Sequence, residues 1–145
     1  MQSLPQEIQH CIVNFLIEPQ PKCLLDDIRS YRSELFVVSE LYCIYWDALG
    51  IESLETYIIE WFHHDLYLFC RVNSTKGTFP LFQLFMRYPQ IHSKTDAYRF
   101  FVGIFEEKTI LQKINLLWGL LRPEEREHFS EFLKEIIFSK IEKLT

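Results

Sequence analysis

The stretch LLDDIRSYRSELFVVSELYCIYWDALG, residues 24–50, determines the predicted fold more than any other part of the sequence. Its apolar residues recur at alternating steps of four and three, which is the spacing of one narrow face of an α-helix. Gly50 follows the last of them, where a glycine favours the end of a helix. We therefore expect one long amphipathic helix over 24–49, with an apolar seam formed by Leu24, Ile28, Tyr31, Leu35, Val38, Tyr42, Tyr45 and Leu49. The seam fits a central helix around which the others pack; the alternative is a stripe that mediates dimerisation.

Further helices are predicted on both sides of this stretch. Ser3 and Gln6 have the spacing of a capping box, and so do Thr109 and Gln112. Pro123 suits the first position of a last helix. No segment alternates with period two for the length of a strand. The sequence therefore predicts an all-α fold, a single compact bundle of six to seven helices in one domain over 1–145, with helices over 4–16, 24–49, 53–72, 79–87, 96–105, 109–120 and 123–143.

The same spacing predicts which side chains are buried. In the helix over 53–72 the expected core residues are Leu54, Tyr57, Ile58, Trp61, Leu66 and Phe69. In the helix over 96–105 they are Tyr98, Phe101, Val102 and Phe105. Core positions are also expected for Phe79, Phe82, Phe85 and Tyr88, with a lined groove as the alternative. Because no C-x-x-C pair is present, reduced core residues are expected at Cys11, Cys23, Cys43 and Cys70.

Composition and charge restrict the classes of partner. The 13 Phe, seven Tyr and three Trp make up 16% of the chain, so apolar surface is expected to remain for a protein partner. The formal net charge is −5 and the basic residues are scattered, which argues against nucleic-acid binding. No apolar run has the length of a membrane helix, and the first residues lack the pattern of a signal peptide. We expect a cytoplasmic protein with no membrane partner.

The sequence shows no motif of a known catalytic centre. Phosphate-binding glycine loops, nucleophile elbows and zinc-protease signatures are absent. Two Glu-x-x-His pairs, Glu60 with His63 and Glu125 with His128, have the spacing of di-iron ligands, but this composition gives such pairs readily by chance. His64 and Asp65 are neighbours on a helix, where side chains point about 100° apart, so they are not expected to act together. We predict no catalytic residue, no metal site and no cofactor.

The first 16 residues carry a resemblance to a known family. The run Leu4-Pro5-Gln6-Glu7-Ile8, followed by Ile12 and Phe15-Leu16, resembles the opening of the F-box. This three-helix module docks substrate receptors onto the Skp adaptor of cullin–RING ubiquitin ligases, and similar openings occur in proteins of large DNA viruses. The resemblance extends loosely over 1–49. It implies that a Skp-type adaptor would be contacted by Leu4, Pro5, Ile8, Ile12 and Leu16.

These observations leave three hypotheses about function. The first is a non-enzymatic protein-interaction module, an F-box-like recruiter that docks a Skp-type adaptor. The second is a self-associating structural or viral accessory protein, a homodimer or larger homo-oligomer, active in the host cytoplasm if viral. A lesser alternative is a helical metal-binding protein. Replacement of Leu4 and Pro5 by alanine distinguishes the first two, because only adaptor capture should be lost.

Overall fold

The computed structural model describes residues 6, 21–50, 55–72 and 81–143, and every structural statement below concerns these residues. They contain helices and no strand, which confirms the predicted all-α class. In chain order the elements are α2 (Lys22–Leu49), α3 (Glu55–Val72), α4 (Phe82–Phe85), α5 (Lys94–Phe100), the π-helix η1 (Phe101–Phe105), α6 (Ile110–Leu120) and α7 (Pro123–Glu142).

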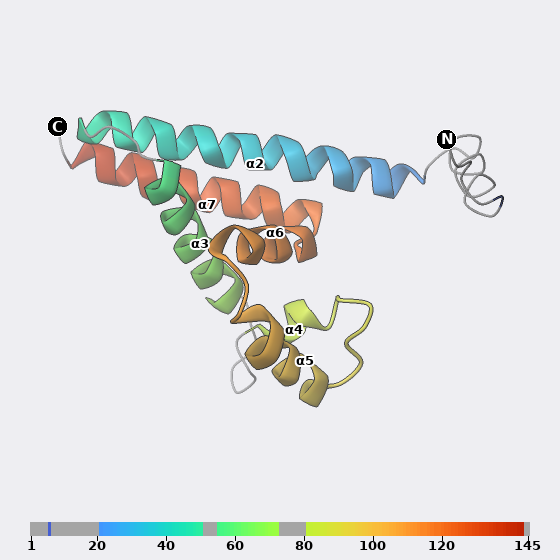
Figure 1. Cartoon of the computed structure of the whole chain (residues 1–145). Coiled ribbons are helices and arrows are strands. Elements are labelled where there is room, and N and C mark those ends of the chain that lie inside the picture. Colours follow the sequence, from blue (N-terminus) through green and yellow to red (C-terminus); the bar gives the residue numbers. More distant parts are fainter. Residues whose placement is uncertain (1–5, 7–20, 51–54, 73–80, 144–145) are drawn as a thin grey trace.

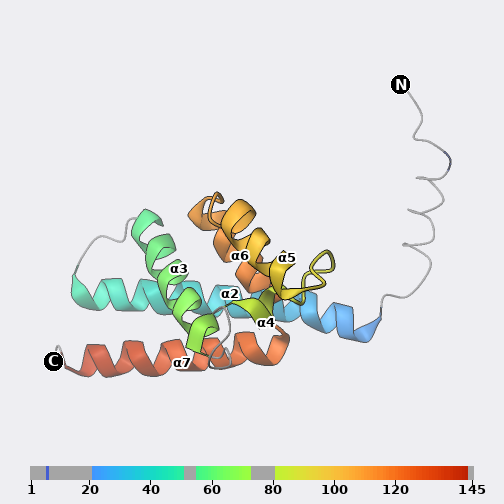
Figure 2. The same cartoon turned by 90° about the horizontal axis from the view of Figure 1, so that it is seen from below.

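The two longest helices, α2 and α7, lie side by side and run in the same direction (Figures 1 and 2). Their parallel register is shown by contacts at both ends. Arg126, near the start of α7, pairs with Asp27 near the start of α2, and the Lys140 ammonium lies 5.4 Å from the centre of the Tyr45 ring near their ends. Helices α3 and α6 pack against each other on one side of this pair, and α4 and α5 lie farthest from α2 (Figure 1).

The long helix ends as the sequence predicts. Gly50 adopts a left-handed conformation with φ 64°, and its N–H donates to the carbonyl of Asp47 at 3.0 Å. At the other end α2 begins at Lys22, slightly before the predicted Leu24, because the carbonyl of Pro21 already accepts the N–H of Leu24 at 2.9 Å. The predicted seam therefore lies on a single continuous helix.

Replacing Gly50 and Gly119 by alanine should change the free energy of unfolding in opposite directions. A Cβ at either position meets no atom within 4 Å, so backbone conformation alone decides the effect. Gly50→Ala places an L-residue at positive φ and should lower the free energy of unfolding by about 1 kcal/mol. Gly119→Ala lies inside α6 and should raise it by up to about 1 kcal/mol. Urea denaturation measures both, and equal signs would contradict this account of the helix end.

The caps of α6 and α7 explain why these helices begin where the sequence predicts. The backbone N–H of Gln112 donates to the Thr109 hydroxyl at 3.3 Å, and the N–H of Thr109 donates to the Gln112 side chain at 3.1 Å. Pro123 occupies the first turn of α7. The Glu125 carboxylate accepts the N–H of Arg122 at 2.8 Å, so two predicted helix starts are held by local hydrogen bonds.

The core is centred on the side chain of Trp118, which is fully buried. Its ring meets Phe62 of α3 at 5.7 Å and Phe129 of α7 at 5.9 Å, both in edge-on geometry. Its indole N–H donates to the carbonyl of Tyr31 in α2 at 3.0 Å. One side chain of α6 thus contacts three other helices, and edge-on aromatic pairs add to the apolar burial.

The prediction for the helix over 96–105 was wrong in its buried face. Phe105 is buried and Phe101 is partly buried against the core, as expected, but Tyr98 and Val102 are 59% and 49% exposed. The other buried residues of this segment are Ala97 and Phe100. The cause is a change of winding at Phe101. The N–H of Glu106 donates to the carbonyl of Phe101 at 3.0 Å, a bond across five residues that defines a π-helix and shifts the faces relative to regular α-helical spacing.

Other burial predictions need smaller corrections. In α3, Leu66 and Phe69 are buried as predicted, whereas Tyr57 and Trp61 are partly exposed and Phe62 is buried instead. Because α3 crosses the α2–α7 pair, its buried face is rotated toward Phe62. The short helix α4 buries Phe85, as expected of a core position; Phe79 lies outside the described residues.

The cysteines were predicted to be core residues, and only one described cysteine is. Cys70 is buried and its thiol is free; burial raises its pKa to about 12, so it stays an unreactive thiol. Cys23 is exposed in the first turn of α2, where it lines an open pocket with residues of the α6–α7 junction. Cys43 is half-buried, and Cys11 lies outside the described residues.

Candidate functional site

The residues that the F-box resemblance singles out, Leu4, Pro5, Ile8, Ile12 and Leu16, lie outside the described part of the chain. Their role stays a prediction. The described surface that follows them in the chain is the start of α2, and its geometry is therefore the first feature of a candidate interaction site.

The apolar seam of α2 is exposed where α2 extends beyond α7. Leu24 is 41% exposed, Leu25 38% and Ile28 50%, whereas Val38 farther along the seam is fully buried. The α6–α7 junction borders the start of α2 on the side of Cys23 and Asp27, where the two line a pocket. Because α2 extends past the start of α7, Leu24, Leu25 and Ile28 stay exposed (Figure 1). We call the seam residues Leu24 and Ile28, together with the adjacent Leu25 that lies off the seam, the exposed seam end. It is an apolar patch on a rigid helix.

A buried arginine holds the exposed seam end in place. The Arg126 side chain is 1% exposed, and its guanidinium donates to the Asp27 carboxylate at 2.7 Å and to the Trp118 carbonyl at 3.1 Å. The same group lies 5.3 Å from the centre of the Tyr31 ring, within range of a cation–π contact. These contacts join the start of α2 to α6 and α7. Asp27 therefore acts as the partner of a buried cation.

The carboxylate of Glu125 forms a bidentate ion pair with Arg87. Arg87, after α4, donates both of its terminal nitrogens to Glu125, one of them at 2.7 Å, and donates to the Leu120 carbonyl at 2.9 Å. This hydrogen bonding lowers the pKa of Glu125 below its usual value. The His128 ring instead lies edge-on against Phe69, with centroids 5.5 Å apart. Glu125 and His128 therefore make separate structural contacts.

Two of the remaining motif residues, Asp65 and His63, also make contacts within the fold. The Asp65 carboxylate accepts a hydrogen bond from the Tyr42 hydroxyl at 2.8 Å, which ties α3 to α2. His63 lies on α3, with its ring centroid 6.2 Å from that of Tyr67 one turn later. Within the described ranges, three or more His, Cys, Asp or Glu side chains nowhere gather closely enough to hold a metal ion.

The burial of His63 predicts that the stability of the fold depends on pH. Its Nε2 atom is buried with no hydrogen-bond partner in the described structure, and burial, followed by the charges of Lys113 and His64, lowers its pKa below the usual value. Glu106 opposes this effect. Because protonation then favours the unfolded chain, the contribution of His63 is complete above about pH 6.5 and is lost as the pH falls through its folded-state pKa.

We therefore expect the free energy of unfolding to fall between about pH 7 and pH 5, and His63→Gln to reduce that fall. The matched control is His92→Gln, at an exposed position whose charge is not among the causes that lower the pKa of His63, and it should keep the wild-type pH dependence. Urea denaturation at a series of pH values measures all three proteins. Identical pH dependence in wild type and His63→Gln would contradict the account.

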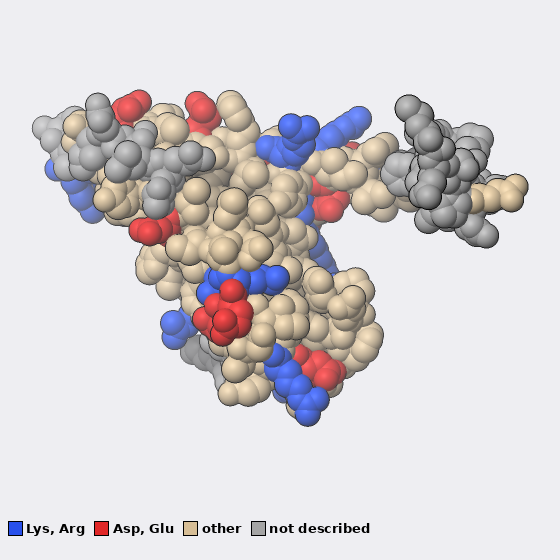
Figure 3. All heavy atoms as spheres, viewed as in Figure 1, with Lys and Arg blue, Asp and Glu red and all other residues tan. Residues whose placement is uncertain are grey.

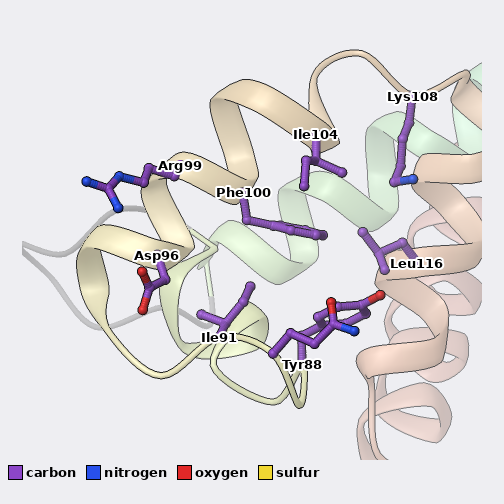
Figure 4. A pocket seen from close by; sticks show the side chains of 9 residues that line it. Tyr88, Ile91, Asp96, Arg99, Phe100, Ile104, Lys108 and Leu116 are labelled. Atoms are coloured by element: carbon purple, nitrogen blue, oxygen red, sulfur yellow. The ribbon is translucent and has the colours of Figure 1, made fainter.

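A second surface feature is a pocket of about 380 Å³ between the 88–91 turn, α5, η1 and α6. Figure 4 shows Phe100 and Ile104 on one side, Ile91 and Tyr88 on the other and Leu116 at one end. Polar groups stand at its margin, and its full lining is Tyr88, Gln90, Ile91, Asp96, Arg99, Phe100, Ile104, Lys108 and Leu116. No local sequence pattern predicts this pocket, because four separate segments supply its lining residues.

The charges on the surface do not form a field of one sign on the face that Figure 3 shows. Basic and acidic side chains are interspersed there, with apolar and neutral surface between them. None of the helices that the structure describes combines the length and apolarity needed to cross a membrane.

Comparison with known proteins adds no relative: no protein-family model matches the sequence, and no curated protein or solved structure is significantly similar to it. The candidate site therefore consists of the exposed seam end and the pocket, both defined by the geometry of the chain itself.

Proposed function

We propose that this chain is a non-enzymatic protein-interaction module of the F-box-like kind, which docks a Skp-type adaptor of a ubiquitin ligase through its N-terminal part. The observation that carries the proposal is the exposed seam end. Leu24 and Ile28 continue a seam that is buried elsewhere in α2, and they follow closely after the residues that match the F-box opening. The proposed setting is the cytoplasm, that of the host if the protein is viral.

Physical chemistry supports a protein partner for this surface. Apolar side chains on a rigid helix gain free energy when a partner removes them from water, at about 25 cal/mol per Å² of apolar surface. The Arg126 and Asp27 contact fixes the helix before binding, so little conformational entropy is lost when the partner docks. In the proposed complex Leu4, Pro5, Ile8, Ile12 and Leu16 contact the adaptor together with Leu24 and Ile28.

The test is the affinity for a purified Skp-type adaptor, measured by biolayer interferometry. Leu4→Ala with Pro5→Ala should abolish binding, and Ile28→Glu should weaken it at least about tenfold because a charge enters the apolar contact. The matched control is Phe36→Glu, also at an exposed apolar position of α2 but off the seam. The proposal fails if the wild-type chain does not bind, or if Ile28→Glu and Phe36→Glu weaken binding equally.

A second candidate function is self-association, and a different face of α2 favours it. Phe36, Val37 and Ile44 are 66%, 40% and 43% exposed and lie off the seam, so a second copy of the chain could cover them. Replacement of Val37 and Ile44 by glutamate should then convert a dimer to a monomer, whereas Leu4→Ala with Pro5→Ala should leave the dimer intact. Sedimentation velocity measures the outcome.

A further inference from the structure

The pocket of Figure 4 has the chemistry of a peptide-binding site. Ile91 and Phe100 are 5% and 9% exposed and form a buried floor, whereas Ile104 is 50% exposed and forms an open wall. Most ligand pockets have volumes of about 300–1,000 Å³, so a volume of about 380 Å³ suits a small occupant, such as one apolar side chain and its neighbour. The apolar floor requires an apolar group.

One cation in the pocket is available to an occupant. Lys108 extends toward Leu116 at one end of the pocket (Figure 4) and forms no ion pair within the described residues. Arg99 points away from the centre of the pocket. Asp96 is already engaged, because its carboxylate accepts a hydrogen bond from the Ser93 hydroxyl at 2.6 Å. The charge complementary to this pocket is therefore one negative group placed beside the apolar anchor.

From these observations we infer that the pocket binds a segment of a partner polypeptide in which an apolar side chain is followed closely by a carboxylate. A single available ammonium suits one carboxylate, whereas a nucleic acid backbone needs a cluster of cations. Ile104, which forms the open wall, is 50% exposed, so a chain can seat one side chain in the pocket and continue along the surface on either side.

The inference extends the proposed function, on which it rests for its biological role: this pocket would hold the target that the module brings to the adaptor. The two sites are separate in the chain. The exposed seam end lies at the start of α2, and the pocket lies among α5, η1 and α6. Peptide binding is therefore measured without the adaptor, so that failure of one proposal is distinguished from failure of the other.

The experiment selects peptides from a displayed library of random 12-residue sequences on the purified full chain. Selections run in parallel on wild type, on Lys108→Glu and on the matched control Lys134→Glu, which changes a half-exposed lysine of α7. Circular dichroism and urea denaturation verify that each variant is folded. The consensus peptide is then labelled, and its dissociation constant for each variant is measured by fluorescence polarisation.

We expect wild type and Lys134→Glu to enrich the same consensus, an apolar residue next to Asp or Glu. Lys108→Glu should weaken that peptide about tenfold and should enrich peptides with Lys or Arg beside the anchor instead. Ile104→Asp, at an exposed position, should abolish binding. The inference is overturned if no consensus emerges, if the consensus is basic or uncharged, or if Lys108→Glu and Lys134→Glu behave alike.

Discussion

Trp118→Ala should lower the free energy of unfolding by about 4 kcal/mol, the largest effect expected of any single substitution in this chain. The indole is fully buried and contacts Phe62 and Phe129, so its removal leaves a cavity between α3, α6 and α7. The hydrogen bond from its N–H to the Tyr31 carbonyl is lost as well. For a chain of this length we expect the melting temperature to fall by more than about 10 °C.

The matched variant Trp118→Phe separates the two contributions. It keeps most of the apolar volume and the edge-on ring contacts but has no N–H to donate, so it should cost about 1–2 kcal/mol. Urea denaturation followed by circular dichroism measures both variants. A cost below about 1.5 kcal/mol for Trp118→Ala would mean that the site collapses without a cavity, and it would contradict the central place of Trp118 in the core.

Arg126→Ala should lower the free energy of unfolding by about 3 kcal/mol, close to the effect of Trp118→Ala. The guanidinium is 1% exposed and donates to the Asp27 side chain, the Asp27 carbonyl and the Trp118 carbonyl. Alanine removes these bonds and the contact with the Tyr31 ring together. The start of α2 would then lose its attachment to α6 and α7.

Arg126→Met gives the informative contrast. Asp27 is partly exposed, so water can solvate its carboxylate once the cation is gone, and methionine fills much of the vacated volume. We expect a cost of at most about 1.5 kcal/mol for methionine, well below that of alanine. Chemical denaturation at pH 7 measures the difference. Equal costs for the two variants would show that charge pairing, and not filled volume, dominates at this position.

Much of the fold was predictable because its signals are local. The end of α2 depends on Gly50, the start of α6 on the capping box between Thr109 and Gln112, and the start of α7 on Pro123. Each signal acts within one turn of the helix, so the residue types alone reveal it. The seam of α2 was predictable for the same reason, since helical periodicity is a property of neighbouring positions.

What the sequence could not show depends on residues far apart in the chain. Periodicity places Leu24 and Ile28 on the seam, but their exposure depends on where α7 begins, about a hundred residues later. The pairing of Asp27 with Arg126 has the same origin, because 99 residues separate the two. The π-helical turn at Phe101 changes the buried face of its segment. Gly103 lies within this turn, but a glycine inside a helical pattern does not by itself specify a π-helix.

The candidate site likewise has one part that a local sequence pattern predicts and one part that depends on residues far apart in the chain. The F-box-like residues were found as a short contiguous motif, whereas the pocket is formed by side chains of four segments that only the fold brings together. Lys108 and Leu116 illustrate the difficulty: neither belongs to a motif, and their position at one end of the pocket follows from the packing of η1 and α6 (Figure 4). Sequence patterns predict the individual helices, but the pocket forms only when these helices pack together.

The central claim is adaptor docking, and size-exclusion chromatography with light scattering tests it most directly. The full chain is run alone and then mixed with a purified Skp-type adaptor. The account predicts a new peak with the mass of a one-to-one complex, which disappears when Leu4 and Pro5 are replaced by alanine. Elution of the chain at an unchanged position and mass in the presence of adaptor would contradict it, and a dimer mass for that peak would favour self-association instead.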